Sequence, residues 1–162
     1  MLHIRCIQPG DDPEMGQLIR SVLLEFNVPK VGTAYADPSL DAMYQFYQSP
    51  KSRYYVLTDG QTIFGGAGVA PLANFHSNYC ELQKMYFSKQ ARSKGYGRQM
   101  MDLCLKFAVA EKFDFCYIET MDYMKRAQTL YLRSGFDYID GPLGDTGHHA
   151  CGIKMLKTIS QL

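Results

Sequence analysis

The stretch Arg92-Ser93-Lys94-Gly95-Tyr96-Gly97-Arg98 joins the end of an apolar strand pattern to the start of an amphipathic helix pattern. At such a junction the first N–H groups of the helix have no acceptor in the helix, and the helix dipole adds partial positive charge. Gly95 and Gly97 let the main chain turn tightly with no Cβ in the way, and basic side chains flank them. The stretch predicts a phosphate site, with a pyrophosphate as the natural ligand. A helix-entry loop that binds nothing is the alternative.

Two common phosphate motifs do not fit this stretch. A dinucleotide-binding fingerprint needs a third glycine where the chain has Met100, and no Gly-Lys-Ser/Thr sequence of a P-loop is present. The sequence therefore argues against a nicotinamide dinucleotide or a nucleoside triphosphate as the ligand.

The composition is that of an ordinary globular protein. Of 162 residues, 46% are hydrophobic and 20% are charged, and the formal net charge is +1. This length predicts a single domain over residues 1–162. A near-neutral charge gives no reason to expect a nucleic-acid partner.

The cysteines and the apolar runs bear on the cellular compartment. Five widely spaced cysteines form no C-x-x-C pair, which is typical of free thiols in a reducing compartment. The sequence shows no signal-peptide run and no apolar run of about 18 residues. We expect a cytoplasmic protein with no membrane partner.

Hydrophobic periodicity divides the chain into strands and helices in the order β-α-α-β-β-β-α-β-α-β-β. Asp12 is the expected N-cap of the first helix, with Pro13 at the first helical position. The predicted strands span residues 2–8, 53–58, 61–72, 79–87, 113–120, a short run from 136, and 150–157, and the predicted helices span 13–26, 40–47, 97–112 and 124–134. This order predicts an α/β (mixed α+β) fold, in which a mixed sheet carries helices on both faces.

Three glycines interrupt the second strand of the predicted hairpin. Asp59-Gly60 is a strong turn signal, and Gly65, Gly66 and Gly68 follow it in the return strand. Glycines inside a strand indicate a bulge or a close approach of another backbone.

Two motifs resemble those of the GNAT superfamily of acetyl-CoA-dependent N-acetyltransferases. Arg92 to Gly97 is similar to the central motif Q/R-x-x-G-x-G/A, and Ala127 to Phe136 is similar to the second element A-x-x-L-Y-x-x-x-G-F. The resemblance covers nearly the whole chain in element order, and the motifs lie within residues 79–111 and 115–137. It implies one GNAT-like domain with a twisted, mostly antiparallel sheet of about seven strands.

The resemblance also implies where acetyl-CoA, the expected co-substrate, would bind. The pantetheine arm would lie between the strand before the phosphate loop and the strand after its helix, against the backbone of Met85, Tyr86 and Phe87. The diphosphate would lie on Arg92, Ser93, Lys94, Gly95, Tyr96, Gly97 and Arg98. Lys94 and Arg98 could also reach the 3′-phosphate of the adenosine end. No metal is implied.

The implied reaction is the attack of an amine on a thioester. An alkylammonium with a pKa of about 10 must first lose a proton. Glu81 resembles the family's catalytic glutamate in position, which implies a general base acting through a water. In a regular strand Glu81, Gln83, Met85 and Phe87 would share one face, that of the cofactor groove. A carboxylate paired with a neighbouring Lys or Arg is the alternative.

Tyr131 lies where the family's general acid resides. A phenol can hydrogen-bond the leaving sulfur and protonate the departing thiolate. Core packing with a tethered hydroxyl is the alternative. The N–H of Met85 is the expected donor to the carbonyl oxygen, in the manner of an oxyanion hole.

The resemblance places the acceptor near the first two helices, their loop and the segment between the last strands. The candidate contacts are Phe26, Tyr35, Asp37, Tyr44, Glu119, His148 and His149. Glu119 could receive an ammonium or be a surface carboxylate. His148 and His149 would point to opposite faces of an extended segment, so a shared metal is not expected, although a neutral histidine could assist proton removal.

Three functions remain open at this stage. The first is N-acetylation of a small-molecule, amino-acid or peptide amine, which the acidic and aromatic acceptor candidates favour. The second is acylation of a macromolecule, such as a protein N-terminus, a lysine or an aminoacyl-tRNA. The third is a non-catalytic acyl-CoA-binding module, against which the presence of both Glu81 and Tyr131 argues. The sequence leaves a monomer and a homodimer equally open.

Overall fold

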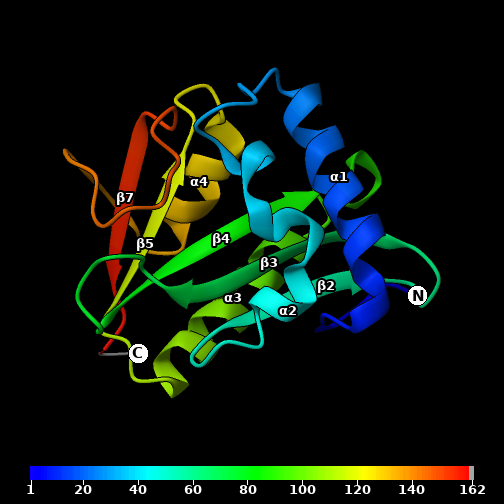
Figure 1. The fold of residues 1–162 in the computed structure, drawn as a ribbon, viewed down its shortest axis with the longest axis horizontal. Helices are drawn as coiled ribbons and strands as arrows, with labels where there is room; N and C mark the ends of the chain where they lie inside the picture. The colour runs from blue at the N-terminus through cyan, green and yellow to red at the C-terminus, as the bar shows by residue number, and fades with distance from the viewer. Residues whose placement is uncertain (161–162) are drawn as a thin grey trace.

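The computed structural model describes residues 1–160. Its strands are β1 (His3–Cys6), β2 (Arg53–Thr58), β3 (Ile63–Pro71), β4 (Tyr79–Phe87), β5 (Phe115–Thr120), β6 (Asp137–Ile139) and β7 (Ile153–Thr158). Its helices are α1 (Asp12–Glu25), α2 (Met43–Phe46), α3 (Tyr96–Ala110) and α4 (Lys125–Arg133), with short 3-10 turns η1 (Pro9–Asp11), η2 (Ala34–Ala36), η3 (Pro38–Asp41) and η4 (Lys89–Ala91). The strands form one seven-stranded sheet in the order β1-β2-β3-β4-β5-β7-β6, which confirms the expected fold class (Figure 1).

The pairing of β4 with β5 is parallel, while the other neighbouring strands pair antiparallel. The β4–β5 ladder runs only from Tyr79 and Phe115 to Glu81 and Tyr117, although β4 continues to Phe87. Beyond that point the two strands diverge (Figure 1). The backbone of β4 after Glu81 therefore has no strand partner on its β5 side.

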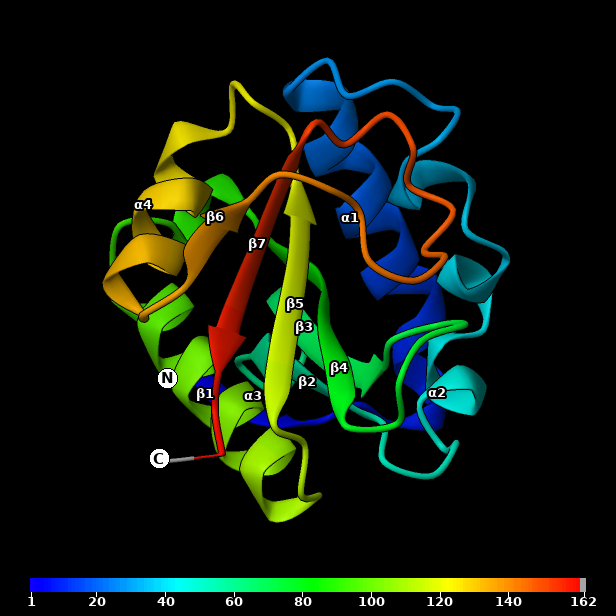
Figure 2. The same ribbon diagram turned by 90° about the vertical axis from the view of Figure 1, so that its left-hand side faces the viewer.

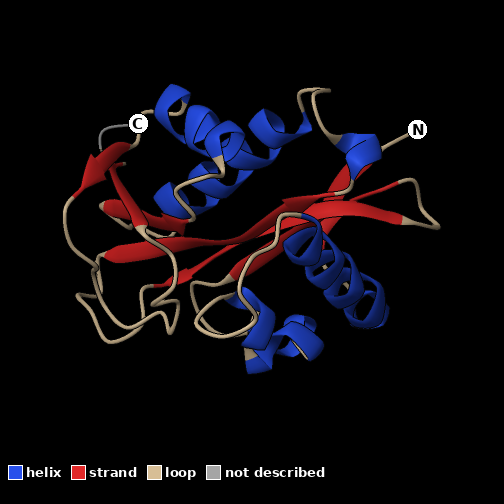
Figure 3. Ribbon diagram, turned by 90° about the horizontal axis from the view of Figure 1, so that it is seen from above, coloured by secondary structure: helices blue, strands red, loops and turns tan. Residues whose placement is uncertain are grey.

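The sheet separates two hydrophobic cores. One face is covered by α3 and α4, and the other by α1 and the short helices (Figure 3). The expected apolar stripes supply both cores: Met100, Cys104, Phe107 and Ala108 from α3, and Met15, Ile19 and Leu23 from α1 with Leu40, Met43 and Tyr47. The sheet is thereby held rigid from both sides at the level where β4 and β5 part.

The start of α1 lies one residue earlier than predicted. Asp11 is the N-cap and Asp12 is already helical, with Pro13 in the first turn, where proline needs no N–H acceptor. The Oδ1 atom of Asp12 accepts the N–H of Tyr44 (2.8 Å) instead of capping its own helix. The contact ties α2 to the start of α1.

A β-bulge interrupts β4. Gln83 pairs with Gly68 and Tyr86 pairs with Gly66, so β4 has one residue more than β3 between these pairs. Lys84 takes up the extra length with a φ of 51°. The inserted residue reverses the inward and outward alternation of every residue after it.

Because of the bulge, the prediction that Glu81, Gln83, Met85 and Phe87 share one face of β4 is wrong. Glu81 and Gln83 face the α1 side, where Gln83 Oε1 accepts a hydrogen bond from Tyr47 (2.7 Å). Met85 and Phe87 pack instead against the core under α3. Regular alternation predicted one face because it allowed for no inserted residue.

Tyr54 stabilises the bulge from the neighbouring strand. Its hydroxyl donates to the carbonyl of Lys84 (2.7 Å) in the interior. A Cβ on Gly66 or Gly68 would lie 2.6 or 2.5 Å from the Tyr54 ring. The strand glycines thus make room for this ring beside the bulge, and the bulge is one of the two features predicted for them.

The described helices include none with the length and apolar character that a membrane crossing needs. All five cysteines are free thiols: Cys80, Cys104, Cys116 and Cys151 are buried, and Cys6 is exposed.

Candidate active site

The predicted phosphate stretch forms the entry to α3. Gly95 is the N-cap residue with a φ of 84°, and Ser93 is also left-handed at 61°. The first helical hydrogen bond runs from Gln99 N–H to Gly95 O (3.2 Å), so the preceding amides have no acceptor within the helix. A Cβ on Gly95 would meet no atom within 4 Å, which leaves the backbone open to a ligand. The loop thus has the amides and the dipole of an anion site.

The basic side chains of the loop have different roles. Arg92 donates through Nε to the carbonyl of Phe87 (2.8 Å) and through both Nη atoms to Glu25 at the end of α1 (2.8 and 2.9 Å). Its guanidinium also lies 5.0 Å from the ring centroid of Phe26. Arg92 therefore fixes the loop to α1, whereas Lys94 is exposed and available to an anion.

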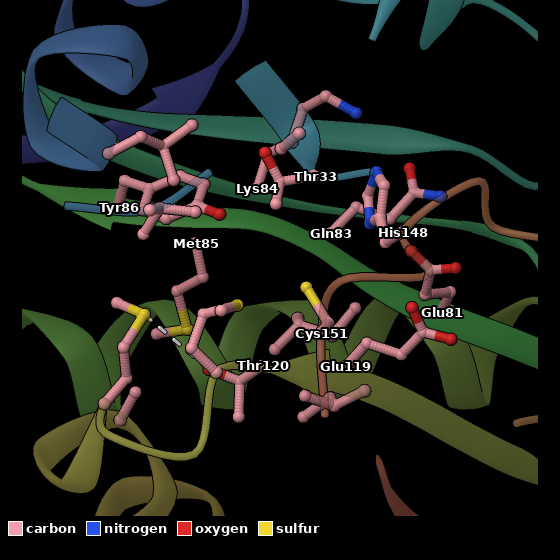
Figure 4. Close-up of a pocket in the computed structure, with 18 of the residues that line it drawn as sticks. Thr33, Glu81, Gln83, Lys84, Met85, Tyr86, Glu119, Thr120, His148 and Cys151 are labelled. Atoms are coloured by element: carbon pink, nitrogen blue, oxygen red, sulfur yellow. Dashed lines mark hydrogen bonds between the residues drawn. The ribbon is translucent and has the colours of Figure 1, made fainter. Parts of the chain in front are cut away.

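A pocket of about 60 Å³ lies where β4 and β5 part. Its lining includes six of the residues singled out in the sequence, namely Glu81, Met85, Tyr86, Glu119, Tyr131 and His148. Figure 4 shows Glu81, Glu119 and His148 gathered toward one end, with Met85 and Tyr86 toward the other. The structure therefore brings both catalytic candidates, from β4 and α4, to one cavity.

Glu81 is 4% exposed and its carboxylate makes no hydrogen bond within residues 1–160. Burial raises the pKa of Glu81 from 4.5 to about 7, and the charge of His148 opposes part of this rise. A carboxyl group with such a pKa exchanges protons readily near neutral pH, as a general base must.

Tyr131 projects from α4 into the same pocket and is 6% exposed. No hydrogen bond ties its hydroxyl to another of the described residues. Burial, together with the nearby Cys151, raises the pKa of Tyr131 well above its usual range. The phenol therefore keeps its proton at neutral pH and can donate it.

A three-membered ionic cluster lies on the α1 side of the pocket. Nε2 of His148 lies 2.9 and 3.0 Å from the two carboxylate oxygens of Asp37, and Nζ of Lys84 lies 2.9 Å from Oδ2. Burial opposes charging of His148, but the hydrogen bond and charge of Asp37 outweigh it and raise the pKa of the imidazole. Burial would raise the pKa of Asp37, yet His148 and Lys84 hold it below its usual range.

Glu119 anchors the loop between β6 and β7. Its Oε1 atom accepts the hydroxyl of Tyr117 (2.6 Å) and its Oε2 atom accepts the hydroxyl of Thr146 (2.7 Å). Leu143 N–H in turn donates to the Tyr117 hydroxyl (3.2 Å). Both carboxylate oxygens of Glu119 therefore already accept a hydrogen bond, which leaves each oxygen only part of its capacity for an ammonium group.

The β6–β7 loop lies against the segment that follows α1 (Figure 2). Ala150 N–H donates to Gly32 O (3.0 Å), and a Cβ on Gly32 would lie 2.5 Å from Nε2 of His149. His148 and His149 therefore contact different residues, and the structure brings only His148 into the pocket.

The other candidates lie outside the pocket lining. Phe26 packs beneath Arg92, and the Tyr35 ring lies 5.2 Å from Nζ of Lys30. Arg98 forms an ion pair within α3. Arg98 lines a separate pocket with Lys106, Arg133 and Lys157.

Lys84, Cys151 and Thr33 also line the pocket, and the sequence reasoning passed over all three. Lys84 faces this side because of the bulge, for which the glycines of β3 were the only available signal. Nothing in the sequence pattern distinguished Cys151 or Thr33. Within residues 1–160 no three His, Cys, Asp or Glu side chains are grouped as a metal site requires.

Comparisons with known proteins agree with this geometry. Residues 19–136 match the profile of the acetyltransferase (GNAT) family. The uncharacterized N-acetyltransferase YjgM of Escherichia coli (strain K12) is 39% identical over 150 residues, which cover 92% of this chain and 90% of YjgM.

Two solved structures share the fold at lower identity. An acetyltransferase of the GNAT family from Staphylococcus aureus Mu50 superimposes with a TM-score of 0.86 at 21% identity, covering 98% of this chain and 99% of its own. The PaiA N-acetyltransferase from Thermoplasma acidophilum, solved in complex with coenzyme A, gives a TM-score of 0.69 at 13% identity, covering 98% and 99%. From the profile match and the identity with YjgM, the chain belongs to the GNAT family and is an N-acetyltransferase.

Proposed function

We propose that the protein transfers the acetyl group of acetyl-CoA directly to a small, cationic primary amine, in free form or on an amino acid or peptide. The observation that carries this proposal is the shared pocket of Glu81 and Tyr131 at the point where β4 and β5 diverge. A base and an acid on one cavity fit amine attack on a thioester better than passive acyl-CoA binding.

The residues present fit coenzyme A. The entry to α3 offers unpaired amides to a diphosphate, and a Cβ at Gly95 would meet nothing. Beyond Glu81 the β4 backbone has no strand partner on its β5 side, so Met85, Tyr86 and Phe87 can offer main-chain groups to an extended arm there. PaiA, which shares the fold, was solved with coenzyme A.

In the proposed reaction, bound acetyl-CoA supplies an activated thioester carbonyl. Glu81 removes a proton from the ammonium, directly or through a water, so that the nitrogen lone pair can form the new C–N bond. The N–H of Met85 hydrogen-bonds the carbonyl oxygen as its charge grows. Tyr131 donates its proton to the sulfur as the C–S bond breaks. The nitrogen, now bonded to the acetyl carbon, gives up its second proton, which returns to the Tyr131 phenolate and leaves the neutral amide and the free thiol.

The charges around the acceptor end favour a cation. Among the described groups whose charges act on Glu81, Glu119 and Asp37 are acids, while Lys84 and His148 are bases that already face Asp37. The pocket is lined on several sides and is narrow at its base, which suits the slender end of an amine chain.

The test is release of free thiol from acetyl-CoA with a panel of acceptors. The panel holds agmatine, putrescine, spermidine, lysine and short peptides, beside ribosomes and aminoacyl-tRNA as macromolecular acceptors. We expect turnover with at least one small cationic amine, loss of that turnover in Glu81→Gln, and a product heavier than the amine by one acetyl group.

Two outcomes would contradict the proposal. Turnover only with protein or RNA acceptors would assign the enzyme to macromolecular acylation. Binding of acetyl-CoA without transfer to any acceptor would leave a binding module.

A further inference from the structure

The Lys84–Asp37–His148 cluster has no part in the proton transfers proposed so far, yet it is largely buried beside them. The side chains of Lys84, Asp37 and His148 are 4%, 18% and 13% exposed. Buried ionic groups are costly unless they are paired, and here one carboxylate pairs with two bases. The cluster therefore calls for a role that an apolar contact could not fulfil.

We propose that Lys84 and Asp37 are positioning residues that hold His148 as a cation facing Glu81, so that Glu81 stays ionised and able to take the proton of the acceptor amine. This inference rests on the proposed role of Glu81 as the base. It adds a positioning unit built from three separate segments of the chain: the bulge of β4, the turn between η2 and η3, and the β6–β7 loop.

The geometry fixes the direction of the imidazole. Both oxygens of Asp37 lie within 3.0 Å of Nε2, so that edge of the ring is occupied. The bond from Lys84 to Oδ2 (2.9 Å) prevents the carboxylate from turning away. Nδ1 forms no hydrogen bond within the part of the chain that is described, and the ring lines the same pocket as Glu81 (Figure 4).

The β-bulge is what brings Lys84 to Asp37. In a regular strand Gln83 and Lys84 would point to opposite faces, but both serve the α1 side here. The carbonyl of Lys84 is held by Tyr54, so the bulge is a fixed feature of the sheet. The bulge thus places the ammonium group of Lys84 next to the Asp37 carboxylate.

The charged groups that face Glu81 come from four segments. His148 and Lys84 favour its ionised form, whereas Glu119 and Asp37 disfavour it, and burial disfavours it most. His148 is the strongest of the charges that act on Glu81. The neutral thiol of Cys151 and the phenol of Tyr117 lie in the same neighbourhood. Loss of His148 would leave the carboxyl group facing mainly acids.

The test is an NMR titration of the Glu81 carboxyl carbon in the full chain labelled with ¹³C-glutamate, assigned by the signal lost in Glu81→Gln. In His148→Gln we expect the midpoint of Glu81 to rise by about one pH unit, as for a carboxylate that loses a nearby opposite charge. His149→Gln is the matched control, and its midpoint should equal that of the unchanged protein. In Asp37→Asn the midpoint of His148, read from its ring protons, should fall by about one unit.

A second variant separates charge from loop packing. Thr146→Val removes two hydrogen bonds of the β6–β7 loop, from the Thr146 hydroxyl to Glu119 and from the backbone N–H of His148 to that hydroxyl, but keeps the His148 side chain. An upward shift in His148→Gln but not in Thr146→Val supports a cationic role. An unchanged midpoint in His148→Gln, or an equal rise in Thr146→Val, would overturn the proposal.

The titration needs neither acetyl-CoA nor an acceptor. Failure of every amine in the acceptor panel therefore refutes the proposed function without deciding this inference. Conversely, a normal amine turnover with an unmoved Glu81 midpoint refutes this inference alone. Where an acceptor is found, the acidic limb of kcat/KM should move with the midpoint.

Discussion

At the scale of single residues, burial raises the pKa of two groups of the pocket, which have opposite proposed tasks. It raises the pKa of Glu81 to about 7, so this group can take up and release a proton near neutral pH. It raises the pKa of Tyr131 further above neutrality, so this group remains a donor. One desolvated cavity thereby holds both the proposed base and the proposed acid.

Removal of the Tyr131 hydroxyl tests its proposed role as the acid. We expect Tyr131→Phe to lower kcat on the order of 10-fold to 10⁴-fold, because the departing thiolate loses its proton donor. Binding of acetyl-CoA, measured by calorimetry, should change little. The matched control is Tyr138→Phe, at an exposed tyrosine of β6. An undiminished kcat in Tyr131→Phe would remove this residue from the mechanism.

The raised pKa of Glu81 also predicts how stability depends on pH. The pKa of the Glu81 carboxyl is about 7 in the folded protein and 4.5 in the unfolded chain. The folded state therefore holds this proton more tightly. Its contribution to stability is complete below pH 4.5 and is lost as the pH rises through about 7. The difference amounts to about 3 kcal/mol of unfolding free energy. Glu81→Gln should therefore gain stability relative to the unchanged protein between pH 5 and pH 8.

Urea denaturation of both proteins at the two pH values measures this gain. A difference in unfolding free energy that stays constant with pH would show that the Glu81 carboxyl titrates normally.

At the scale of secondary-structure elements, the bulge in β4 determines which side chains meet. Periodicity located β4 at residues 79–87 and the helix after the phosphate loop, because strand and helix patterns are local properties of the sequence. It assigned Met85 to the wrong face because the bulge depends on the partner strand, where glycines leave room for Tyr54. The contact of Lys84 with Asp37 could not be predicted from the sequence for the same reason.

The Tyr54 hydroxyl should contribute to stability through the bulge. In Tyr54→Phe the buried carbonyl of Lys84 loses its donor, which we expect to cost about 1–3 kcal/mol of unfolding free energy. Tyr55→Phe, at the next position of β2 and only half-buried, is the control for loss of a phenol. Equal stabilities of the two variants in urea would show that the bulge does not need this bond.

The entry to α3 allows a similar test of backbone conformation. At a φ of 84° Gly95 occupies the left-handed region, where a Cβ costs about 1–2 kcal/mol. Gly95→Ala should be destabilised by this amount and should bind coenzyme A more weakly, because the amides of the loop are displaced. Gly10→Ala, whose Cβ also meets nothing within 4 Å, is the control. A Gly95→Ala protein with unaltered stability and affinity would argue against a strained anion loop.

At the scale of the whole molecule, a net charge of +1 conceals an uneven distribution. Basic side chains gather at the entry to α3, and acids gather where the acceptor would enter between β4 and β5. The bond between Arg92 and Glu25 joins the loop before α3 to the end of α1. This distribution fits the proposed binding of an anionic co-substrate at one side of the pocket and a cationic acceptor at the other.

The sequence predicted this arrangement in outline. The glycines at 95 and 97 and the Leu130-Tyr131 pair carry local signals, and the structure confirms the fold that they indicate. The acceptor end depends on contacts between distant loops, such as His148 with Asp37, which no local pattern specifies. For this reason the sequence left both His148 and His149 as candidates, and the structure shows that His148 alone of the two lines the pocket.

The central claim is that coenzyme A binds with its diphosphate on the amides at the start of α3. Titration calorimetry of the folded protein with coenzyme A and with acetyl-CoA tests it most directly. We predict saturable heat with both compounds at one molecule per chain, weakened in Gly95→Ala. Absence of binding heat with either compound, from protein shown to be folded, would contradict the account.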